Sequence, residues 1–339
     1  MNERVSVIIP NWNGARFLPV CLESLRRQTY RDFITYVVDN GSIDGSLELL
    51  RQNFPEVVVV GFPENRGFSV AINAGIAASR GEYLVALNND TEADPRWLEE
   101  LVRALDSRPD IGFCASKVLD FTERLVIDSY GDGYTWAGLS FKVGTLQRDD
   151  GRFDRPLEVL SACGAAAIYR RSMLHDIGAF DEEFFCYMED VDLGIRAQLA
   201  GYRCLAVPTA RIYHIGSAST GGGPSEFSVR MTTKNLYNVM IKNMPLPLLL
   251  VMLPLAVAAQ AFLVLRALFL ASGSKLRPNL RGFWQGLWAA ARQAPGMLRK
   301  RREVQRKRRI DTGSVVSLIR NSQRQRQTAP AVIDGNPAE

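Results

Sequence analysis

The first third of the chain alternates between short apolar runs and stretches with helical spacing. The apolar runs cover residues 5–10, 35–38, 57–61 and 83–87. The helical stretches cover residues 17–29, 45–53, 68–78 and 95–107. Strands that alternate with helices in this way form a parallel sheet with helices packed on both faces. The pattern therefore predicts an α/β domain with buried strands.

Polar residues follow every one of the four predicted strands. In chain order they include Asn11, Asp39, Asn65, Gly67, Asn88 and Asp90. Because nucleotides bind parallel sheets at the carboxyl ends of the strands, we expect the four loops to form one nucleotide-binding crevice. Each loop alone also fits a simple turn, since Asn and Gly tolerate positive φ and Ser or Asp caps a following helix. The repetition of polar loops in strand order favours the crevice.

Length and composition bound the class of protein. The chain has 339 residues, 47% of them apolar, which is enough to build a sizeable core. Its five cysteines are widely spaced without a C-x-x-C pair, which argues against a disulfide framework or a thiolate zinc site and favours a reducing cytoplasm. The first residues lack the basic and apolar regions of an export signal, so we expect the protein to stay inside the cell.

The net charge of +5 hides an asymmetry along the chain. Residues 1–265 carry 25 basic and 32 acidic side chains, a net charge of −7, whereas residues 266–339 carry 16 and 4, a net charge of +12. An acidic body therefore precedes a basic tail, and the two parts need separate explanations.

The tail begins with an apolar segment and continues with a basic amphipathic one. Residues 246–271 are long enough to cross a bilayer, which takes about 20 apolar residues. A crossing would carry the basic tail away from the cytoplasm, so we expect an interfacial helix or a re-entrant turn near Pro254. In the next segment, eight of the eleven residues 299–309 are basic. Before them, apolar side chains recur at helical spacing: Phe283, Trp284, Leu287 and Trp288.

Tryptophan with Arg and Lys suits an anionic membrane surface. Nucleic acid is the rival partner for a basic tract, but the acidic body and the apolar segment disfavour it. We predict a membrane-association region at residues 244–310 and a location on the cytoplasmic side of the cell membrane, peripheral or partly inserted through residues 245–310. Residues 311–339 are predicted to be disordered. The Gly- and Ser-rich residues 216–225 are interpreted as a lid over a ligand.

The segment FFCYMEDVDLGIRAQLAG, residues 184–201, sets carboxylates among aromatic and apolar side chains, where desolvation is costly. Asp192 and Arg196 fit an i,i+4 helix pair worth about 0.3 kcal/mol. The acidic residues 181–183 fit the first turn of a helix. These interpretations leave Glu189 and Asp190 unexplained, at the start of a predicted helix.

Five motifs occur in a fixed order along the chain. They are VSVIIPNWNG (5–14), VVDNGSIDGS (37–46), NRGFSVAINAGI (65–76), LNNDTE (87–92) and FDEEFFCYMEDVDLGIRAQLAGYR (180–203). Together they resemble the successive motifs of the family 2 inverting glycosyltransferases, and most closely those of bacterial rhamnosyltransferase-like enzymes. The resemblance implies a GT-A glycosyltransferase domain at residues 1–243, which would bind a nucleoside-diphosphate sugar and move the sugar to an acceptor hydroxyl.

The resemblance also implies a nucleoside pocket at the ends of the first strands. Asp39 would accept hydrogen bonds from the base or the ribose. The other residues implied in this pocket are Pro10, Asn11, Asn65, Gly67 and Asn73. A side chain at Gly67 would keep the backbone away from the ligand.

A divalent cation, Mg²⁺ or Mn²⁺, is implied at the diphosphate, because hard cations prefer oxygen ligands. Asp90 would be its carboxylate ligand. Asn88 stands where the family has the first Asp of D-x-D, so it would offer a carbonyl oxygen or bind the donor sugar. His214 lies where some relatives place a histidine on the metal, although a lone histidine among apolar residues is as often a structural core residue.

Asp190 is implied as the general base for the acceptor hydroxyl, with Glu189 beside it in acceptor binding. A single displacement by that hydroxyl inverts the anomeric centre without a covalent intermediate. From the resemblance alone, the first candidate donor is dTDP-rhamnose and the acceptor is a lipid-linked or growing polysaccharide. Two alternatives stay open. The first is a nucleotidyltransferase of similar fold, which the lack of a basic phosphate loop at residues 10–14 disfavours. The second is a non-catalytic nucleotide-sugar-binding scaffold, which the intact acidic pair Glu189 and Asp190 disfavours.

Overall fold

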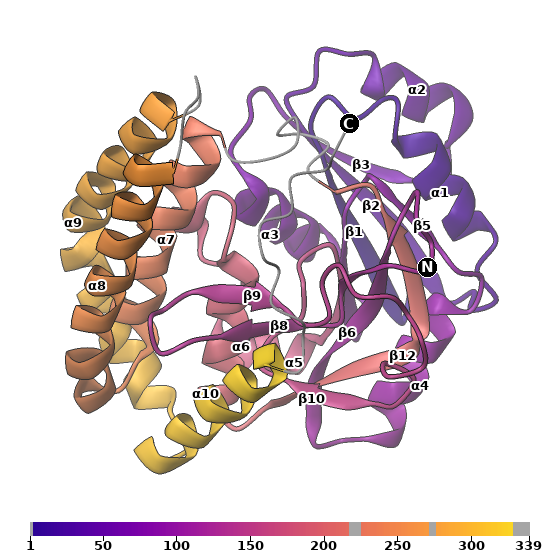
Figure 1. Cartoon of the computed structure of the whole chain (residues 1–339). Coiled ribbons are helices and arrows are strands. Elements are labelled where there is room, and N and C mark those ends of the chain that lie inside the picture. The colour runs from indigo at the N-terminus through magenta and orange to yellow at the C-terminus, as the bar shows by residue number, and fades with distance from the viewer. Residues whose placement is uncertain (1–2, 217–224, 271–275, 328–339) are drawn as a thin grey trace.

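The computed structural model describes residues 3–216, 225–270 and 276–327. Its strands are β1 (Val5–Asn11), β2 (Phe33–Asn40), β3 (Val58–Phe62), β4 (Tyr83–Leu87), β5 (Thr91–Ala93), β6 (Ile111–Asp120), β7 (Ile127–Ser129), β8 (Asp132–Tyr134), β9 (Ser140–Lys142), β10 (Leu157–Val159), β11 (Ala166–Arg170) and β12 (Arg203–His214). Ten of them form one central sheet (Figure 1), whose main path runs β10-β12-β6-β11-β4-β1-β2-β3, while β8 and β9 pair as a separate hairpin. The strands β1 to β4 are mutually parallel, which confirms the predicted α/β class.

The other half of the sheet is mixed. β11 pairs antiparallel with both β4 and β6, and β12 runs parallel to β6. β3 is an edge strand, and its Val58 and Val59 are each 41% exposed. The expectation that all four predicted strands are buried is therefore wrong for β3, because an edge strand has a neighbour on one side only.

Helices cover both faces of the sheet, as predicted. They are α1 (Leu18–Arg26), α2 (Ser46–Asn53), α3 (Phe68–Ala78), α4 (Trp97–Ser107), α5 (Arg171–Ile177) and α6 (Glu189–Leu199). Side chains of β1 alternate between the faces. Val7 and Ile9 pack with α1 and α4, whereas Ile8 packs on the other face with α3 and α6.

The C-terminal helices form a layer beside the sheet (Figure 1). They are α7 (Glu226–Asn243), α8 (Leu246–Leu270), α9 (Leu276–Lys307) and α10 (Thr312–Gln327). α9 packs closely on α7, because a Cβ at Gly282 or Gly286 would lie 2.4 Å or 2.7 Å from a carbonyl oxygen of α7. α8 continues as one helix through Pro254, so the re-entrant turn considered there is not formed.

α10 corrects the prediction of a disordered tail. This helix buries Val315 and Ile319 in a hydrophobic cluster shared with α6 and α7. The backbone N–H of Tyr134 on β8 also donates a hydrogen bond to Ser322 Oγ over 2.7 Å. The prediction is wrong for residues 312–327 because their few apolar side chains lie on one face and find a partner. Residues 328–339, and residues 217–224 of the predicted lid, lie outside the described residues.

A buried charge network joins α6 to α7. Asp192 is fully buried, and its Oδ2 accepts hydrogen bonds from Arg196 Nε and Lys242 Nζ, each over 2.8 Å. Its Oδ1 accepts a third from Asn243 Nδ2 over 2.8 Å. Burial would raise the pKa of Asp192, but Lys242 and Arg196 outweigh it and hold this pKa below its ordinary value. The i,i+4 pair of Asp192 and Arg196 expected from the sequence is therefore confirmed, and Lys242 joins it in a buried network.

The substitution Asp192→Asn is expected to lower the free energy of unfolding by about 3 kcal/mol, because it removes a carboxylate partner from the buried charge of Lys242. Urea denaturation measures this change. As a control, Glu48→Gln on the exposed surface of α2 should change it by less than about 0.5 kcal/mol. An Asp192→Asn protein as stable as the wild type would show that the network is not needed for the packing of α6 on α7.

Candidate active site

A cleft of about 910 Å³ opens at the carboxyl ends of β1 and β4 and extends to the start of α6. The predicted site residues that line it are Pro10, Asn11, Asn65, Gly67, Asn88, Asp90, Glu189, Asp190 and His214. The fold thus brings all but two of the predicted residues to one cavity.

Asp39 and Asn73 do not line the cleft. Asp39 is 1% exposed, and its carboxylate accepts hydrogen bonds from Asn11 Nδ2 and from the backbone N–H of Ser42, each over 3.1 Å. Asn73 Nδ2 donates to the Phe180 carbonyl over 2.8 Å, and Asn73 Oδ1 accepts from the Phe180 N–H over 3.1 Å. Asp39 therefore holds Asn11, and the structure keeps Asn73 out of the cleft because Phe180 already satisfies its amide.

Side-chain amides connect the polar loops at the ends of β1 to β4. Asn40 Nδ2 donates to Asn65 Oδ1 over 3.0 Å and to the Gly67 carbonyl over 3.1 Å. Asn89 Nδ2 donates to Asn11 Oδ1 over 2.7 Å. The four loops therefore form one polar wall, as expected for a crevice.

Gly67 is required by a close contact between this wall and the loop before α6. Its φ is +89°, and a Cβ there would lie 2.6 Å from Phe185 Cδ2 and 2.7 Å from the Phe185 carbonyl oxygen. That oxygen also accepts a hydrogen bond from the Phe68 N–H over 2.6 Å. The steric requirement at Gly67 thus arises from Phe185 within the protein, a reason that the sequence does not reveal.

The loop before α6 is strained and is held by α7. Phe185, Tyr187 and Met188 have φ values of +67°, +68° and +65°, which are costly for residues other than glycine. Asn235 Nδ2 on α7 lies 2.7 to 3.1 Å from three backbone carbonyl oxygens of this loop, those of Phe184, Cys186 and Tyr187. These hydrogen bonds fix the loop that places the start of α6 in the cleft.

Glu189 and Asp190 begin α6 and differ in their contacts. Asp190 is partly exposed, and its two carboxylate oxygens accept hydrogen bonds from the N–H groups of Gly164 over 2.8 Å and Val191 over 2.7 Å. Glu189 is 6% exposed, and its Oε2 has no hydrogen-bond donor among the described residues. Burial raises the pKa of both carboxyl groups, and the charge of Asp190 raises that of Glu189 further. Asp190 is therefore the oriented carboxyl group, whereas the surroundings of Glu189 favour its neutral form.

His214 links the loop after β4 to β7. Its Nε2 lies 3.3 Å from Asp90 Oδ1 and 3.3 Å from Asn88 Nδ2, and its Nδ1 lies 2.9 Å from Asp128 Oδ2. Burial would lower the pKa of His214, but Asp128 and Asp90 raise it to about 9. The histidine is therefore part of a polar cluster and not an isolated core residue.

The cluster around His214 fits a divalent cation. Asp90 is 6% exposed, and its Oδ1 has no hydrogen bond of good geometry among the described residues, although His214 Nε2 lies 3.3 Å away. A buried acceptor left without a partner costs about 1–3 kcal/mol. A carboxylate oxygen, an amide oxygen and an imidazole nitrogen form a ligand set that suits Mn²⁺ or Mg²⁺. A cation bound here would satisfy Asp90.

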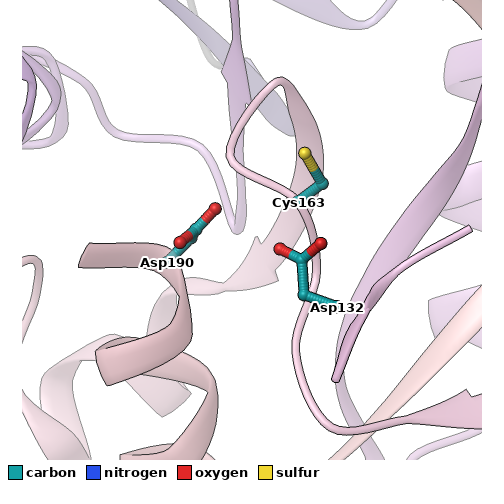
Figure 2. Close-up of side chains that lie close together, drawn as sticks. All are labelled: Asp132, Cys163 and Asp190. Carbon is teal, nitrogen blue, oxygen red and sulfur yellow. The ribbon is translucent and has the colours of Figure 1, made fainter. Parts of the chain in front are cut away.

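Among the polar side chains of the cleft that the sequence analysis did not predict are Asp132, Lys142 and Cys163. Figure 2 shows Asp132 and Cys163 facing Asp190 from separate segments of the chain. Lys142 Nζ on β9 donates to Asp128 Oδ1 over 2.7 Å. One signal in the sequence could have pointed to Asp132 and Lys142. Glycines recur at short intervals in residues 131–144, which is typical of the tight turns of a hairpin, and both charged residues lie between them.

Comparisons with known proteins show the family of this chain. Residues 6–178, just over half of the chain, match the family model "Glycosyl transferase family 2". The chain is 28% identical over 249 residues to an N-acetylglucosaminyl-diphospho-decaprenol L-rhamnosyltransferase of Mycobacterium tuberculosis. The match covers 66% of this chain and 80% of that protein.

Two solved structures share the fold. The mannosyltransferase PcManGT from Pyrobaculum calidifontis, in complex with GDP-Man and Mn²⁺, has a TM-score of 0.53 and 18% identity over 95% of this chain and 88% of its own. TarS of S. aureus, residues 1–349, has a TM-score of 0.56 and 16% identity over 96% of this chain and 92% of its own. The predicted GT-A type of fold and the family resemblance are both confirmed, and the chain belongs to glycosyltransferase family 2.

Proposed function

We propose that this protein transfers a sugar from a nucleoside diphosphate to an acceptor hydroxyl with inversion, and that Asp190 is the general base. The observation that carries the proposal is the position of Asp190, oriented by two backbone N–H groups in the same cleft as the polar loops. By analogy with the mycobacterial relative, dTDP-rhamnose is the first candidate donor and a lipid-linked or growing polysaccharide is the acceptor.

The nucleoside would bind along the polar wall. Pro10, Asn11, Asn65 and Gly67 line this part of the cleft and present backbone and amide groups. Asp39 would act by holding Asn11, whose amide it accepts over 3.1 Å. The connected amides keep these groups in place before a ligand arrives, which limits the entropy lost on binding.

Asp90 and His214 would hold a divalent cation, with Asn88 beside them. The cation would neutralise the charge that develops on the departing diphosphate. Asp128 orients the imidazole of His214 through Nδ1 over 2.9 Å, and Lys142 in turn holds Asp128 over 2.7 Å. Such outer contacts fix the orientation of a metal ligand.

In the reaction, the acceptor oxygen forms a bond to the anomeric carbon while the bond between that carbon and the diphosphate breaks. The electron pair of the broken bond leaves with the diphosphate. The proton of the acceptor hydroxyl goes to Asp190. Burial raises the pKa of this carboxyl group, which makes it a stronger base than an exposed aspartate. A single displacement inverts the anomeric centre.

The Asp190→Asn protein is expected to transfer sugar about 10²–10⁴-fold more slowly, because the amide cannot accept the proton. Its affinity for the nucleoside diphosphate, measured by calorimetry, should stay unchanged. A panel of nucleotide sugars, with dTDP-rhamnose tested first, identifies the donor as the compound whose sugar is transferred to the acceptor or slowly released by hydrolysis. Asp150→Asn, on the exposed loop after β9, is the matched control and should transfer sugar at the wild-type rate. Unchanged transfer in the Asp190→Asn protein would contradict the assignment.

Two substitutions at the cation site should change the affinity for Mn²⁺ in opposite directions. Asp90→Asn removes the carboxylate ligand and is expected to weaken Mn²⁺ binding at least about tenfold, whereas Asn88→Asp adds a carboxylate and should strengthen it. Electron paramagnetic resonance of Mn²⁺, with nucleoside diphosphate present, measures both. Equal Mn²⁺ affinity in the two variants would place the cation elsewhere.

We also propose that the C-terminal helices bind the cytoplasmic surface of an anionic membrane through residues 245–310. In the part of the chain that the structure describes, residues 246–266 of α8 form a helix long and apolar enough to span a bilayer, and 28% of its most apolar stretch is buried. On α9, Trp284 and Trp288 are 62% and 67% exposed. At about 100° per residue they share one face with Arg281, Arg292, Arg299, Arg302 and Arg306.

This face supports a membrane surface as the partner, because indole rings and cationic side chains suit the headgroup region of anionic lipids. The double variant Arg299→Glu, Arg302→Glu should bind vesicles of phosphatidylglycerol and phosphatidylcholine at least about tenfold more weakly, since each arginine near such a surface contributes about 1 kcal/mol. Cosedimentation measures the binding. Arg51→Glu on α2, away from this face, is the control, and equal binding by the double variant would rule out this surface.

A further inference from the structure

Three side chains face one another at the end of the cleft nearest α6 (Figure 2). Asp132 comes from β8, Cys163 from the segment before β11, and Asp190 from the start of α6. One side-chain atom of each lies within 4.8 Å of those of the other two. No hydrogen bond joins the two carboxyl groups in the described part of the chain. The facing oxygens of the two carboxyl groups therefore lie within 4.8 Å of each other.

Asp132 is a buried acid with little support for a negative charge. It is 5% exposed, and the donor to its carboxylate is Ser129 Oγ at the long distance of 3.4 Å. The titratable and charged groups around it come from several elements: Asp190 and Glu189 on α6, Cys163 before β11, Lys142 on β9 and Asp128 on β7. Burial raises the pKa of Asp132 well above its ordinary value, and the charge of Asp190 raises it further. Burial, the nearby charge of Asp190 and the single long hydrogen bond therefore favour the neutral carboxyl group of Asp132, which can donate a hydrogen bond.

We propose that Asp132 is a second acceptor-binding group, which donates a hydrogen bond to an oxygen of the acceptor while Asp190 receives the proton of the attacking hydroxyl. This inference rests on the proposed function. Two hydrogen bonds between oxygens span up to about 5.4 Å, so one acceptor oxygen fits between carboxyl groups whose facing atoms lie within 4.8 Å. The two acids then have complementary states, one a donor and the other an acceptor.

The surroundings hold both carboxyl groups in place. Backbone hydrogen bonds of 2.8 and 3.1 Å pair Asp132 with Ser161, and Ser161 Oγ donates to the Asp190 carbonyl over 2.7 Å. Gly164 approaches Asp190 so closely that a Cβ there would lie 3.2 Å from Asp190 Oδ2. The Tyr134 N–H, two residues after Asp132, is held by Ser322 of α10. A rigid pair of this kind can position one substrate oxygen.

The experiment compares Asp132→Ala, Asp132→Asn and the control Asp150→Asn, with dTDP-rhamnose as donor and N-acetylglucosaminyl diphosphate on a short prenyl chain as acceptor. Asp132→Ala is expected to raise the acceptor KM about tenfold, the size expected for the loss of one hydrogen bond. Asp132→Asn should keep the acceptor KM within about threefold of wild type, because its amide also donates a hydrogen bond. The affinity for dTDP should be the same in all variants.

A pH profile separates this role from a structural one. The folded-state pKa of Asp132 is raised, so this carboxyl group keeps its proton to a higher pH than an exposed aspartate and loses it as the pH rises through that pKa. The acceptor KM of the wild type should therefore rise on the alkaline side, whereas that of Asp132→Asn should stay constant.

The outcomes distinguish this inference from the proposed function. If Asp132→Asn binds the acceptor as poorly as Asp132→Ala, the charge of Asp132 is needed and the inference is overturned. If Asp132→Ala has a normal acceptor KM while Asp190→Asn is inactive, the inference fails and the proposed function stands. A wild-type protein that transfers no sugar to this acceptor, or an active Asp190→Asn protein, overturns both. Because Asp132→Asn preserves shape, it keeps the test valid if Asp132→Ala fails to fold.

Discussion

The junction between α6 and α7 is the interaction on which both the cleft and the C-terminal helices depend. On one side of it, Asp192 holds Lys242 through a buried ion pair. On the other side, Asn235 binds the carbonyl oxygens of the strained loop that leads into α6. Together these contacts fix the helix whose first turn carries Asp190. Helix α7, the first of the C-terminal helices, is therefore part of the support of the site.

Acids close together in this helix have opposite ionisation states because their neighbours differ. Asp192 meets two cations and an amide, so its charge is stabilised despite complete burial. Glu189 meets no donor at Oε2 and faces the charge of Asp190, so the neutral acid is favoured. The carboxylates that stand among aromatic residues in the sequence thus serve two purposes: one connects helices, and the others remain available in a cavity.

The sequence predicted the parts of the fold that depend on local patterns. Short apolar runs located β1 to β4, and the polar loops and the acidic motif located most of the cleft, since each signal lies within a few residues. Contacts between distant segments were not predictable. The engagement of Asn73 by Phe180, the ordering of α10 and the position of Asp132 each depend on a partner at least 50 residues away, and no periodicity records such a partner.

The hydrogen bond from Tyr134 to Ser322 joins positions 188 residues apart. A ribosome adds about 5–20 residues per second, so the hairpin of β8 and β9 waits for this hydrogen bond until α10 has been made. The strands β1 to β4, all near the N-terminus, have no such delay. During synthesis the part of the cleft at these strands can therefore form first, and the part that contains Asp132 is completed later.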